Sequence, residues 1–173
     1  MKELLKVAIT GPESTGKSLL SETLANHYKT VFTKEYAREY LDKTKGKYSL
    51  GDLKIMATEQ FKRQHFDVKR ANRVYFADTE MIVFKVWHEV KYGYVPNWLK
   101  DMLLKQKFDL YLLCDTDIPW VYDPLREHPE QRDFLMEKYK ATFSEYKLSY
   151  ELISGKNIRR IKDAINCIEK LIL

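Results

Sequence analysis

The sequence predicts an α/β fold in which a five-stranded parallel sheet carries helices on both faces. Short apolar runs alternate along the chain with segments whose apolar residues recur at helical spacing. Glycines, prolines or clusters of polar residues separate the two kinds of segment. Polar residues follow every apolar run, as they do in open sheets that bind ligands beyond the carboxyl ends of their strands.

The predicted strands are short and rich in Val, Ile, Leu and aromatic residues. They are expected at about residues 6–10, 30–33, 74–77, 110–114 and 150–153. Helices are expected after residue 17 and around residues 53–61, 82–90, 135–146 and 158–172. Isoleucines at positions 158, 161, 165, 168 and 172 define the buried face of the last helix. Two polar segments, 44–51 and 118–132, contain glycine or proline and are expected to be irregular and mobile.

The composition is that of an ordinary globular protein. A chain of 173 residues predicts one domain, residues 1–173, with a substantial core. A formal net charge of +5 suits an anionic ligand, but it equally fits a lysine-rich solvated surface. The sequence contains no basic arm of the kind that binds nucleic acid, so no nucleic-acid partner is expected. No apolar run is long enough to span a membrane. Cys114 and Cys167 are isolated and resemble small core residues, so we expect a cytoplasmic protein with a small-molecule partner and leave its oligomeric state open.

The residues between the first predicted strand and the first predicted helix fit the phosphate-binding P-loop pattern G-x-x-x-x-G-K-[ST]. Backbone N–H groups of such a loop and the helix N-terminus bind phosphate oxygens. Lys17 is expected to reach the β- and γ-phosphates of ATP, and the Ser18 hydroxyl to ligate Mg²⁺. Glu13 is unusual there, because its carboxylate must point away from phosphate. The predicted nucleotide-binding residues are Gly11, Glu13, Ser14, Thr15, Gly16, Lys17, Ser18, Leu19 and, after the last strand, Gly155.

Two carboxylates follow other predicted strands. Asp78 ends the third apolar run, as a Walker B aspartate does, and is expected to hold Mg²⁺. The alternative is that Asp78 only caps the helix that follows. Glu35 follows the second strand and is placed to accept the proton of an attacking hydroxyl. Its alternative is an exposed cluster of ion pairs with Arg38 and Glu39.

The segment 118–132 is expected to be a lid. Arg126 of this segment, together with Arg132, is expected to bring positive charge to the transferring phosphoryl group while the lid excludes water. The alternative is a pair of ordinary surface arginines. Trp120 in this segment, with Tyr36 and Tyr40 beside Glu35, is expected to stack on a flat ring. By contrast, Trp87 and Trp98 fit apolar helix faces and are expected in the core.

Four motifs together resemble the ribosylnicotinamide kinase domain of the NadR family. They are Gly-Pro-Glu-Ser-Thr-Gly-Lys-Ser at 11–18, Glu-Tyr-Ala-Arg-Glu-Tyr at 35–40, Asp-Thr-Glu at 78–80 and Asp-Pro-Leu-Arg at 123–126. The resemblance implies a P-loop NTPase fold of the nucleoside-kinase kind, with ATP and Mg²⁺ as cofactors. It also implies transfer of the γ-phosphoryl group to the 5′-hydroxyl of nicotinamide riboside, which yields nicotinamide mononucleotide.

Residue roles follow from this resemblance and from the motifs. The predicted catalytic residues are Lys17, Glu35, Asp78, Arg126 and Arg132. The predicted acceptor-binding residues are Glu35, Tyr36, Arg38, Tyr40, Asp78 and Trp120, and the metal ligands are Ser18 and Asp78. Two alternatives stay open: a kinase for another nucleoside or nucleotide, and a regulatory ATP-binding switch. A guanine-binding switch is disfavoured, because residues 114–117 read Cys-Asp-Thr-Asp where such proteins carry Asn-Lys-x-Asp.

Overall fold

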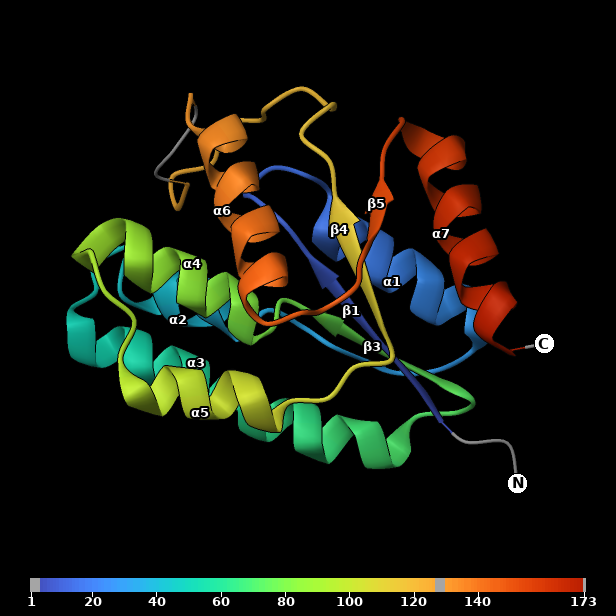
Figure 1. The fold of residues 1–173 in the computed structure, drawn as a ribbon, viewed down its shortest axis with the longest axis horizontal. Coiled ribbons are helices and arrows are strands. Elements are labelled where there is room, and N and C mark those ends of the chain that lie inside the picture. Colours follow the sequence, from blue (N-terminus) through green and yellow to red (C-terminus); the bar gives the residue numbers. More distant parts are fainter. Residues whose placement is uncertain (1–3, 127–129, 173) are drawn as a thin grey trace.

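Five parallel strands form one sheet in the order β2-β3-β1-β4-β5, which confirms the predicted fold class (Figure 1). The computed structural model describes residues 4–126 and 130–172. The strands are β1 (Leu5–Thr10), β2 (Phe32–Thr33), β3 (Val74–Asp78), β4 (Leu110–Cys114) and β5 (Glu151–Ile153). All five were expected, although β2 is shorter than its apolar run suggested.

Strand β1 lies at the centre of the sheet. It pairs with β3 from Leu5 opposite Val74 onward, and with β4 from Val7 opposite Leu110 onward. Every residue of β3 and β4 is buried, which explains why both read as continuous apolar runs rather than alternating ones. Because the strands are parallel, their carboxyl ends meet at one edge of the sheet, where the polar residues that follow them gather.

Helices cover both faces of the sheet. They are α1 (Lys17–Tyr28), α2 (Tyr36–Lys43), α3 (Leu50–Asp67), α4 (Met81–Tyr92), α5 (Asn97–Lys105), α6 (Arg132–Glu145) and α7 (Asn157–Ile172), with a 3₁₀ turn at Val68–Arg70. No helix range was predicted for α2 or α5, although Trp98, expected on an apolar helix face, does lie in α5 and packs partly buried against the core. Helix α2 buries just two residues, Ala37 and Leu41, and is too short to show the helical period in the sequence.

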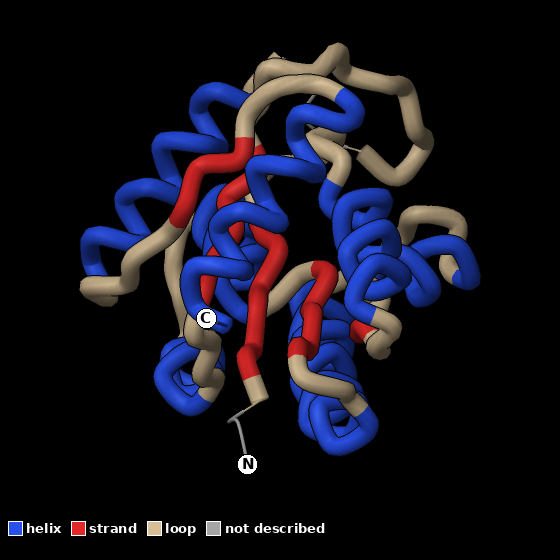
Figure 2. Tube along the Cα trace, turned by 90° about the vertical axis from the view of Figure 1, so that its right-hand side faces the viewer, coloured by secondary structure: helices blue, strands red, loops and turns tan. Residues whose placement is uncertain are grey.

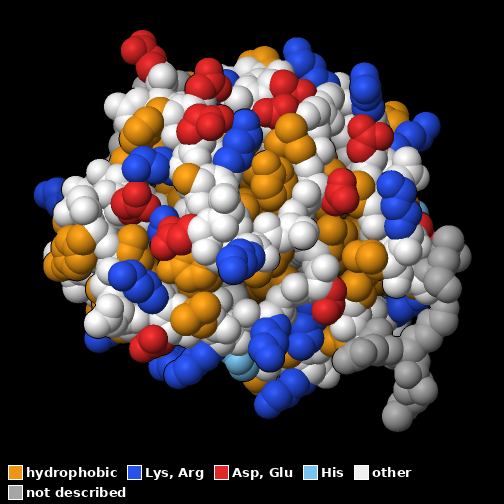
Figure 3. Space-filling model, viewed as in Figure 1, with side chains coloured by type: hydrophobic (Ala, Val, Ile, Leu, Met, Phe, Trp, Pro, Cys, Tyr) orange, Lys and Arg blue, Asp and Glu red, His pale blue; other side chains and the backbone are white. Residues whose placement is uncertain are grey.

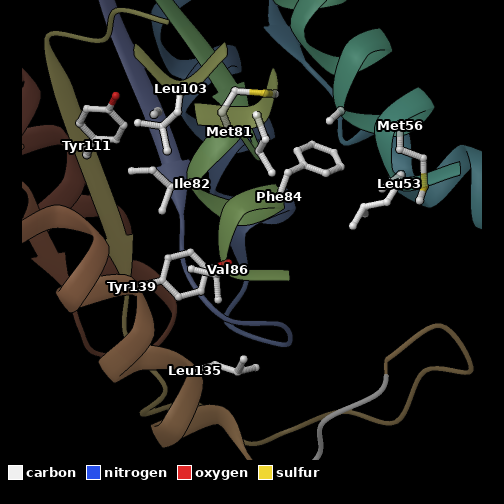
Figure 4. Packing of buried hydrophobic residues seen from close by; sticks show 14 of the residues in the cluster. Leu53, Met56, Met81, Ile82, Phe84, Val86, Leu103, Tyr111, Leu135 and Tyr139 are labelled. Atoms are coloured by element: carbon white, nitrogen blue, oxygen red, sulfur yellow. The ribbon is translucent and has the colours of Figure 1, made fainter. Parts of the chain in front are cut away.

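Two separate cores result from the alternation of side chains along the strands. Val7 and Ile9 of β1 face α1 and α7, whereas Ala8 faces the layer formed by α2 to α6. Figures 1 and 2 show the sheet between these two helical layers. The larger core is assembled mainly from α3, α4, α5 and α6, and Figure 4 shows part of its packing.

The buried face of α7 differs from the isoleucine stripe predicted for it. Ile158 is 66% exposed, while Arg160 two residues later is only 6% exposed. Ala164, Ile168 and Ile172 complete the buried face. The stripe is thus correct at its carboxyl end and wrong at its start, where an arginine replaces the expected apolar contact.

Of the two segments expected to be irregular, 44–51 joins α2 to α3 and 118–132 runs from β4 into α6. Residues 44–46 form a turn and 47–49 are irregular, but Leu50 and Gly51 already lie in α3, which begins with a capping box in which Ser49 and Asp52 exchange hydrogen bonds. Residues 118–126 run between β4 and α6 without a helix or strand. Residues 127–129 of the predicted lid, including Pro129, lie outside the described residues.

The described surface is mixed in charge on the face that Figure 3 shows. Lysine and arginine side chains are interspersed with acidic ones there, so positive charge is spread rather than gathered on that face. Among the helices of residues 4–126 and 130–172, none has the length and apolar content needed to cross a bilayer.

Candidate active site

The P-loop joins β1 to α1 in a conformation that requires glycine at both ends. Gly11 has φ 132°, and a Cβ atom there would lie 2.8 Å from the carbonyl oxygen of Cys114 in β4. Gly16 has φ 78° and caps α1 without any side-chain hydrogen bond to its first turn. The backbone N–H groups at this helix end are therefore available to an anion.

Lys17 crosses the loop in this structure. Its Nζ donates a hydrogen bond to the carbonyl oxygen of Pro12 at 2.7 Å, and the Thr15 hydroxyl donates to the same oxygen at 2.7 Å. These bonds hold the loop closed on itself around the ammonium group. A polyphosphate would offer Lys17 stronger, charged acceptors than this carbonyl.

A cavity of about 650 Å³ opens at the carboxyl edge of the sheet. It brings together most of the residues that the sequence singled out. The predicted residues that line it are Gly11, Glu13, Ser14, Thr15, Gly16, Lys17, Ser18, Leu19, Glu35, Arg38, Asp78 and Arg126. The predicted residues that do not line it are Tyr36, Tyr40, Trp120, Arg132 and Gly155.

Asp78 is the buried carboxylate at the floor of this cavity. It is 2% exposed, and it is hydrogen-bonded by the Ser18 side chain and by the backbone of Glu35. Its Oδ1 atom has no hydrogen-bond partner among the described residues. Burial, and then the nearby Glu35 carboxylate, raise the pKa of Asp78 to about 7, although Ser18 and Lys17 act in the opposite direction. An unpaired carboxylate oxygen beside a serine hydroxyl fits the ligands that Mg²⁺ takes from a P-loop protein.

The alternative that Asp78 caps the next helix is wrong. Glu80 is the N-cap of α4, and its Oε2 accepts a hydrogen bond from the Ile82 N–H at 2.7 Å. The same fully buried carboxylate accepts from Thr10 Oγ1 at 2.8 Å and from Gln106 Nε2 at 2.6 Å. Capping is therefore complete without Asp78, whose free oxygen is left to face a ligand.

Thr79 connects these two carboxylates in an uncommon backbone conformation. Its φ of 74° lies in the left-handed region, which a β-branched residue rarely adopts. Two amide side chains from α3 hold its carbonyl oxygen, Gln60 at 3.2 Å and Gln64 at 2.9 Å. Gln60 also accepts a hydrogen bond from the Tyr36 N–H at 2.7 Å, so it ties the segment after β2 to the segment after β3. The sequence predicted only a helix around residues 53–61, to which Gln60 belongs, and assigned this residue no part in the site.

Part of the cavity wall is apolar and aromatic. It is formed by Val83, Val86, Trp87 and Val90 of α4 and by Leu135 and Tyr139 of α6. Figure 4 labels Val86, Tyr139 and Leu135, which belong to the same buried cluster. Trp87 donates from Nε1 to the Tyr48 hydroxyl at 2.8 Å, which fixes the indole in the wall. The sequence had assigned Trp87 to the core, because periodicity does not distinguish a core from a cavity wall.

The aromatic residues predicted to stack on the acceptor lie elsewhere. Tyr36 packs under the Arg63 guanidinium, 4.3 Å from the ring centroid. Tyr40 donates from its hydroxyl to Asp52 Oδ1 at 2.5 Å. Trp120 is half-buried against Tyr122, with ring centroids 6.2 Å apart. The structure thus corrects their placement, and the aromatic residues that line the cavity are Phe32, Trp87 and Tyr139.

The predicted lid contacts the site through arginines. Arg38 of α2 pairs with Asp123, and this guanidinium lowers the pKa of the Asp123 carboxyl. Arg126, which lines the cavity, donates to the carbonyl oxygen of Val121. Arg132 donates to the carbonyl oxygens of Ser14 at 3.1 Å and Ile118 at 2.9 Å, so here it braces the P-loop against the start of the lid. A direct part for Arg132 in catalysis stays a prediction.

A second, smaller cavity of about 300 Å³ lies on the other side of the P-loop. Its mostly apolar wall combines Gly16 and Leu19 with Ile118, Lys156 and Arg160. Gly155 stands next to this wall, and its N–H donates to Asp117 Oδ2 at 2.5 Å. Because Gly16 and Leu19 line both cavities, a ligand that filled both would pass over the P-loop.

Comparison with known proteins identifies the family of this chain. Residues 6–160 match a family described as an AAA domain. The trifunctional NAD biosynthesis/regulator proteins NadR of Salmonella typhimurium and Escherichia coli are each 34% identical to the chain over 126 residues. That match covers 69% of this chain and 30% of the length of either relative.

Solved structures share the fold. A NadR protein in complex with NR superposes with a TM-score of 0.81 at 24% identity, over 96% of this chain and 51% of that one. A deoxyadenosine kinase from M. mycoides superposes with a TM-score of 0.68 at 15% identity, over 96% and 100% of the two chains. The chain thus belongs to the AAA-domain family matched by residues 6–160, and within it is homologous to part of the NadR proteins.

Proposed function

We propose that this protein is an ATP-dependent kinase that phosphorylates the 5′-hydroxyl of nicotinamide riboside. The observation that carries the proposal is the single cavity that joins a P-loop, the paired Ser18 and Asp78, and the Glu35 carboxylate to an aromatic pocket. A phosphoryl donor and a flat acceptor can meet there with the reacting groups between them. Homology to part of NadR, and the NadR structure that contains NR, support this choice of acceptor.

The P-loop would bind the donor. Its N–H groups and Lys17 would hold the β- and γ-phosphates, with Lys17 leaving the Pro12 carbonyl to do so. Ser18 and Asp78 would hold Mg²⁺, which supplies charge neutralisation to the phosphates when bound. The adenine ring would lie in the smaller cavity beyond Gly16, next to Gly155.

The apolar part of the cavity wall would bind the acceptor ring. Trp87 is the aromatic side chain fixed in that wall, and a cationic pyridinium ring on an indole gains about 0.5–2 kcal/mol from cation–π attraction. Glu13 and Glu35 line the same cavity and add negative charge that favours a cationic ring over a neutral base.

Glu35 would serve as the base that accepts the proton of the attacking hydroxyl. It lines the cavity next to Asp78, whose free oxygen is assigned to the metal instead. Arg126 would place positive charge beside the transferring phosphoryl group when segment 118–132 closes as a lid and excludes water.

Two unpaired thiols, Cys114 and Cys167, support a reducing compartment, and we place the protein in the cytoplasm.

The decisive experiment is a panel of acceptors under identical Mg·ATP. Nicotinamide riboside, uridine, cytidine, adenosine and thymidine are compared by kcat/KM, with the product identified by mass spectrometry. We expect the highest value for nicotinamide riboside and a product heavier by one phosphate. Preference for a neutral nucleoside would refute nicotinamide riboside as the acceptor but would leave the proposed kinase activity intact. ATP binding without any phosphorylated acceptor would favour the regulatory switch.

A further inference from the structure

Arg160 is a buried guanidinium that reaches the carbonyl side of the P-loop. It projects from the first turn of α7 and is 6% exposed. Its Nη1 donates to the Thr15 carbonyl oxygen at 2.6 Å, and its Nε donates to the Gly155 carbonyl oxygen at 2.9 Å. Its Nη2 donates to the Asp115 carbonyl oxygen at 3.2 Å and to Asp117 Oδ1 at 2.6 Å. One side chain thus holds the P-loop and the ends of β4 and β5 together.

This arrangement uses the particular geometry of arginine. Three of the four bonds go to backbone carbonyls in three separate segments and the fourth goes to the Asp117 carboxylate, so four of the five N–H donors of the planar fork are used. A lysine at this position would keep the charge but would have no planar fork to reach these carbonyls together. Asp117 supplies the negative charge that a buried cation needs, and its other oxygen accepts from the Gly155 N–H.

The Thr15 carbonyl oxygen and the Gly16 N–H belong to the same peptide plane and point in opposite directions. When Arg160 fixes that oxygen on one side, it fixes the direction of the Gly16 N–H on the other. Gly16 lines the large cavity and has no side chain of its own to hold it there. We propose that Arg160 is a positioning residue of the phosphate site, which aims the Gly16 N–H at the bound phosphates without touching them.

The proposal extends to the smaller cavity, because Arg160 also lines it. A group bound there would rest against the same side chain that sets the P-loop. Because Arg160 binds both Gly155 in the turn after β5 and Thr15 in the P-loop, a movement of that turn would change the geometry of the phosphate site. This inference rests on the proposed function only in requiring that the P-loop bind phosphates.

The test separates phosphate binding from stability. The dissociation constant of inorganic pyrophosphate with Mg²⁺ is measured by calorimetry at 10 °C for the wild type, Arg160→Lys and Arg160→Met, with thermal unfolding alongside. Arg159→Met is the matched control, because Arg159 is its neighbour and its side chain is 82% exposed. We expect both Arg160 variants to weaken pyrophosphate binding about tenfold, which is about 1.4 kcal/mol, and the control to leave it unchanged. The KM for ATP should rise in parallel while the KM for the acceptor stays constant.

The outcomes distinguish this inference from the proposed function. Wild-type affinity for pyrophosphate in folded Arg160→Lys would overturn the positioning role, even if the variant melts at a lower temperature. A wild-type protein that does not bind pyrophosphate would instead overturn the phosphate site itself. If Arg160→Met does not fold, Asp117→Asn tests the same contact through its partner. Unchanged pyrophosphate binding in that variant and in Arg160→Lys would again reject the inference.

Discussion

Replacing Asp78 by asparagine is expected to make the protein more stable and nearly inactive. Asp78 is 2% exposed and one of its oxygens has no partner among the described residues, so its charge is poorly compensated without a metal. Asparagine has nearly the same shape and removes that charge. It loses no helix cap, since Glu80 performs that function.

The magnitude follows from the pKa of Asp78, which rises from 3.8 to about 7 in the folded protein. Each pKa unit is worth 1.36 kcal/mol, so ionised Asp78 costs at most on the order of 4 kcal/mol near pH 8. Relaxation and entering water reduce this cost, and we expect Asp78→Asn to gain about 1–3 kcal/mol. For a domain of this size that gain raises the melting temperature by roughly 2–10 °C.

The sign of the pH dependence provides a second check. Because the folded pKa lies above the unfolded one, the destabilisation is absent below pH 3.8, grows as the pH rises and is complete above about pH 7. The stability of the wild type relative to Asp78→Asn should therefore fall across this window. Thermal unfolding from pH 5 to 8, without Mg²⁺ or nucleotide, measures it.

Asp115→Asn is the matched control, since both Asp115 oxygens accept hydrogen bonds, from the Thr116 N–H at 2.8 Å and the Ser154 hydroxyl at 2.7 Å. It should not stabilise the protein. Turnover of Asp78→Asn should fall about 10²–10³-fold or more, because the proposed Mg²⁺ site would lose a charged ligand. An Asp78→Asn variant that melts below the wild type at pH 8, or that keeps full turnover, would refute the reasoning.

Three further substitutions test separate parts of the site. Lys17→Ala should lower turnover by about 10²–10³-fold. It should shift the melting temperature little, because the hydrogen bond that Lys17 makes in this structure goes to a loop carbonyl. Unchanged turnover would reject the P-loop assignment. Trp87→Ala should raise the acceptor KM about tenfold and leave the KM for ATP unchanged, with Trp87→Phe intermediate; equal effects on both substrates would point to general disruption of α4. Arg126→Ala should lower kcat strongly and raise the ratio of ATP hydrolysis to transfer, measured as ADP formed against phosphorylated acceptor; an unchanged ratio would remove Arg126 from the proposed lid.

The fold, and the P-loop that forms the donor half of the proposed site, could be predicted from sequence because local rules determine them. Continuous apolar runs mark the buried parallel strands, and the P-loop pattern fixes a strand, a turn and a helix in sequence. Lys17, Ser18 and Asp78 follow directly from that frame.

The acceptor half depends on packing between helices, which short-range patterns do not report. Trp87 occupies a position that fits the apolar face of α4, and only the placement of α6 turns that face into a cavity wall. Tyr36 and Tyr40 are close in sequence to Glu35, but the unpredicted helix α2 turns them toward α3. Arg160 was missed for a similar reason: its polar partners come from three distant segments, so helical periodicity gave no signal for a buried cation.

The central position of β1 has a consequence for how the chain is made. Of the five strands of this sheet, β1 leaves the ribosome before the others, and its partners β3 and β4 follow about 70 and 100 residues later. At about 5–20 residues per second, its apolar edges wait several seconds for a partner. Such long-range parallel pairing folds slowly and leaves strand edges open to other chains. Expression at lower temperature, or with additional chaperone, should therefore change the yield of this protein more than its final stability.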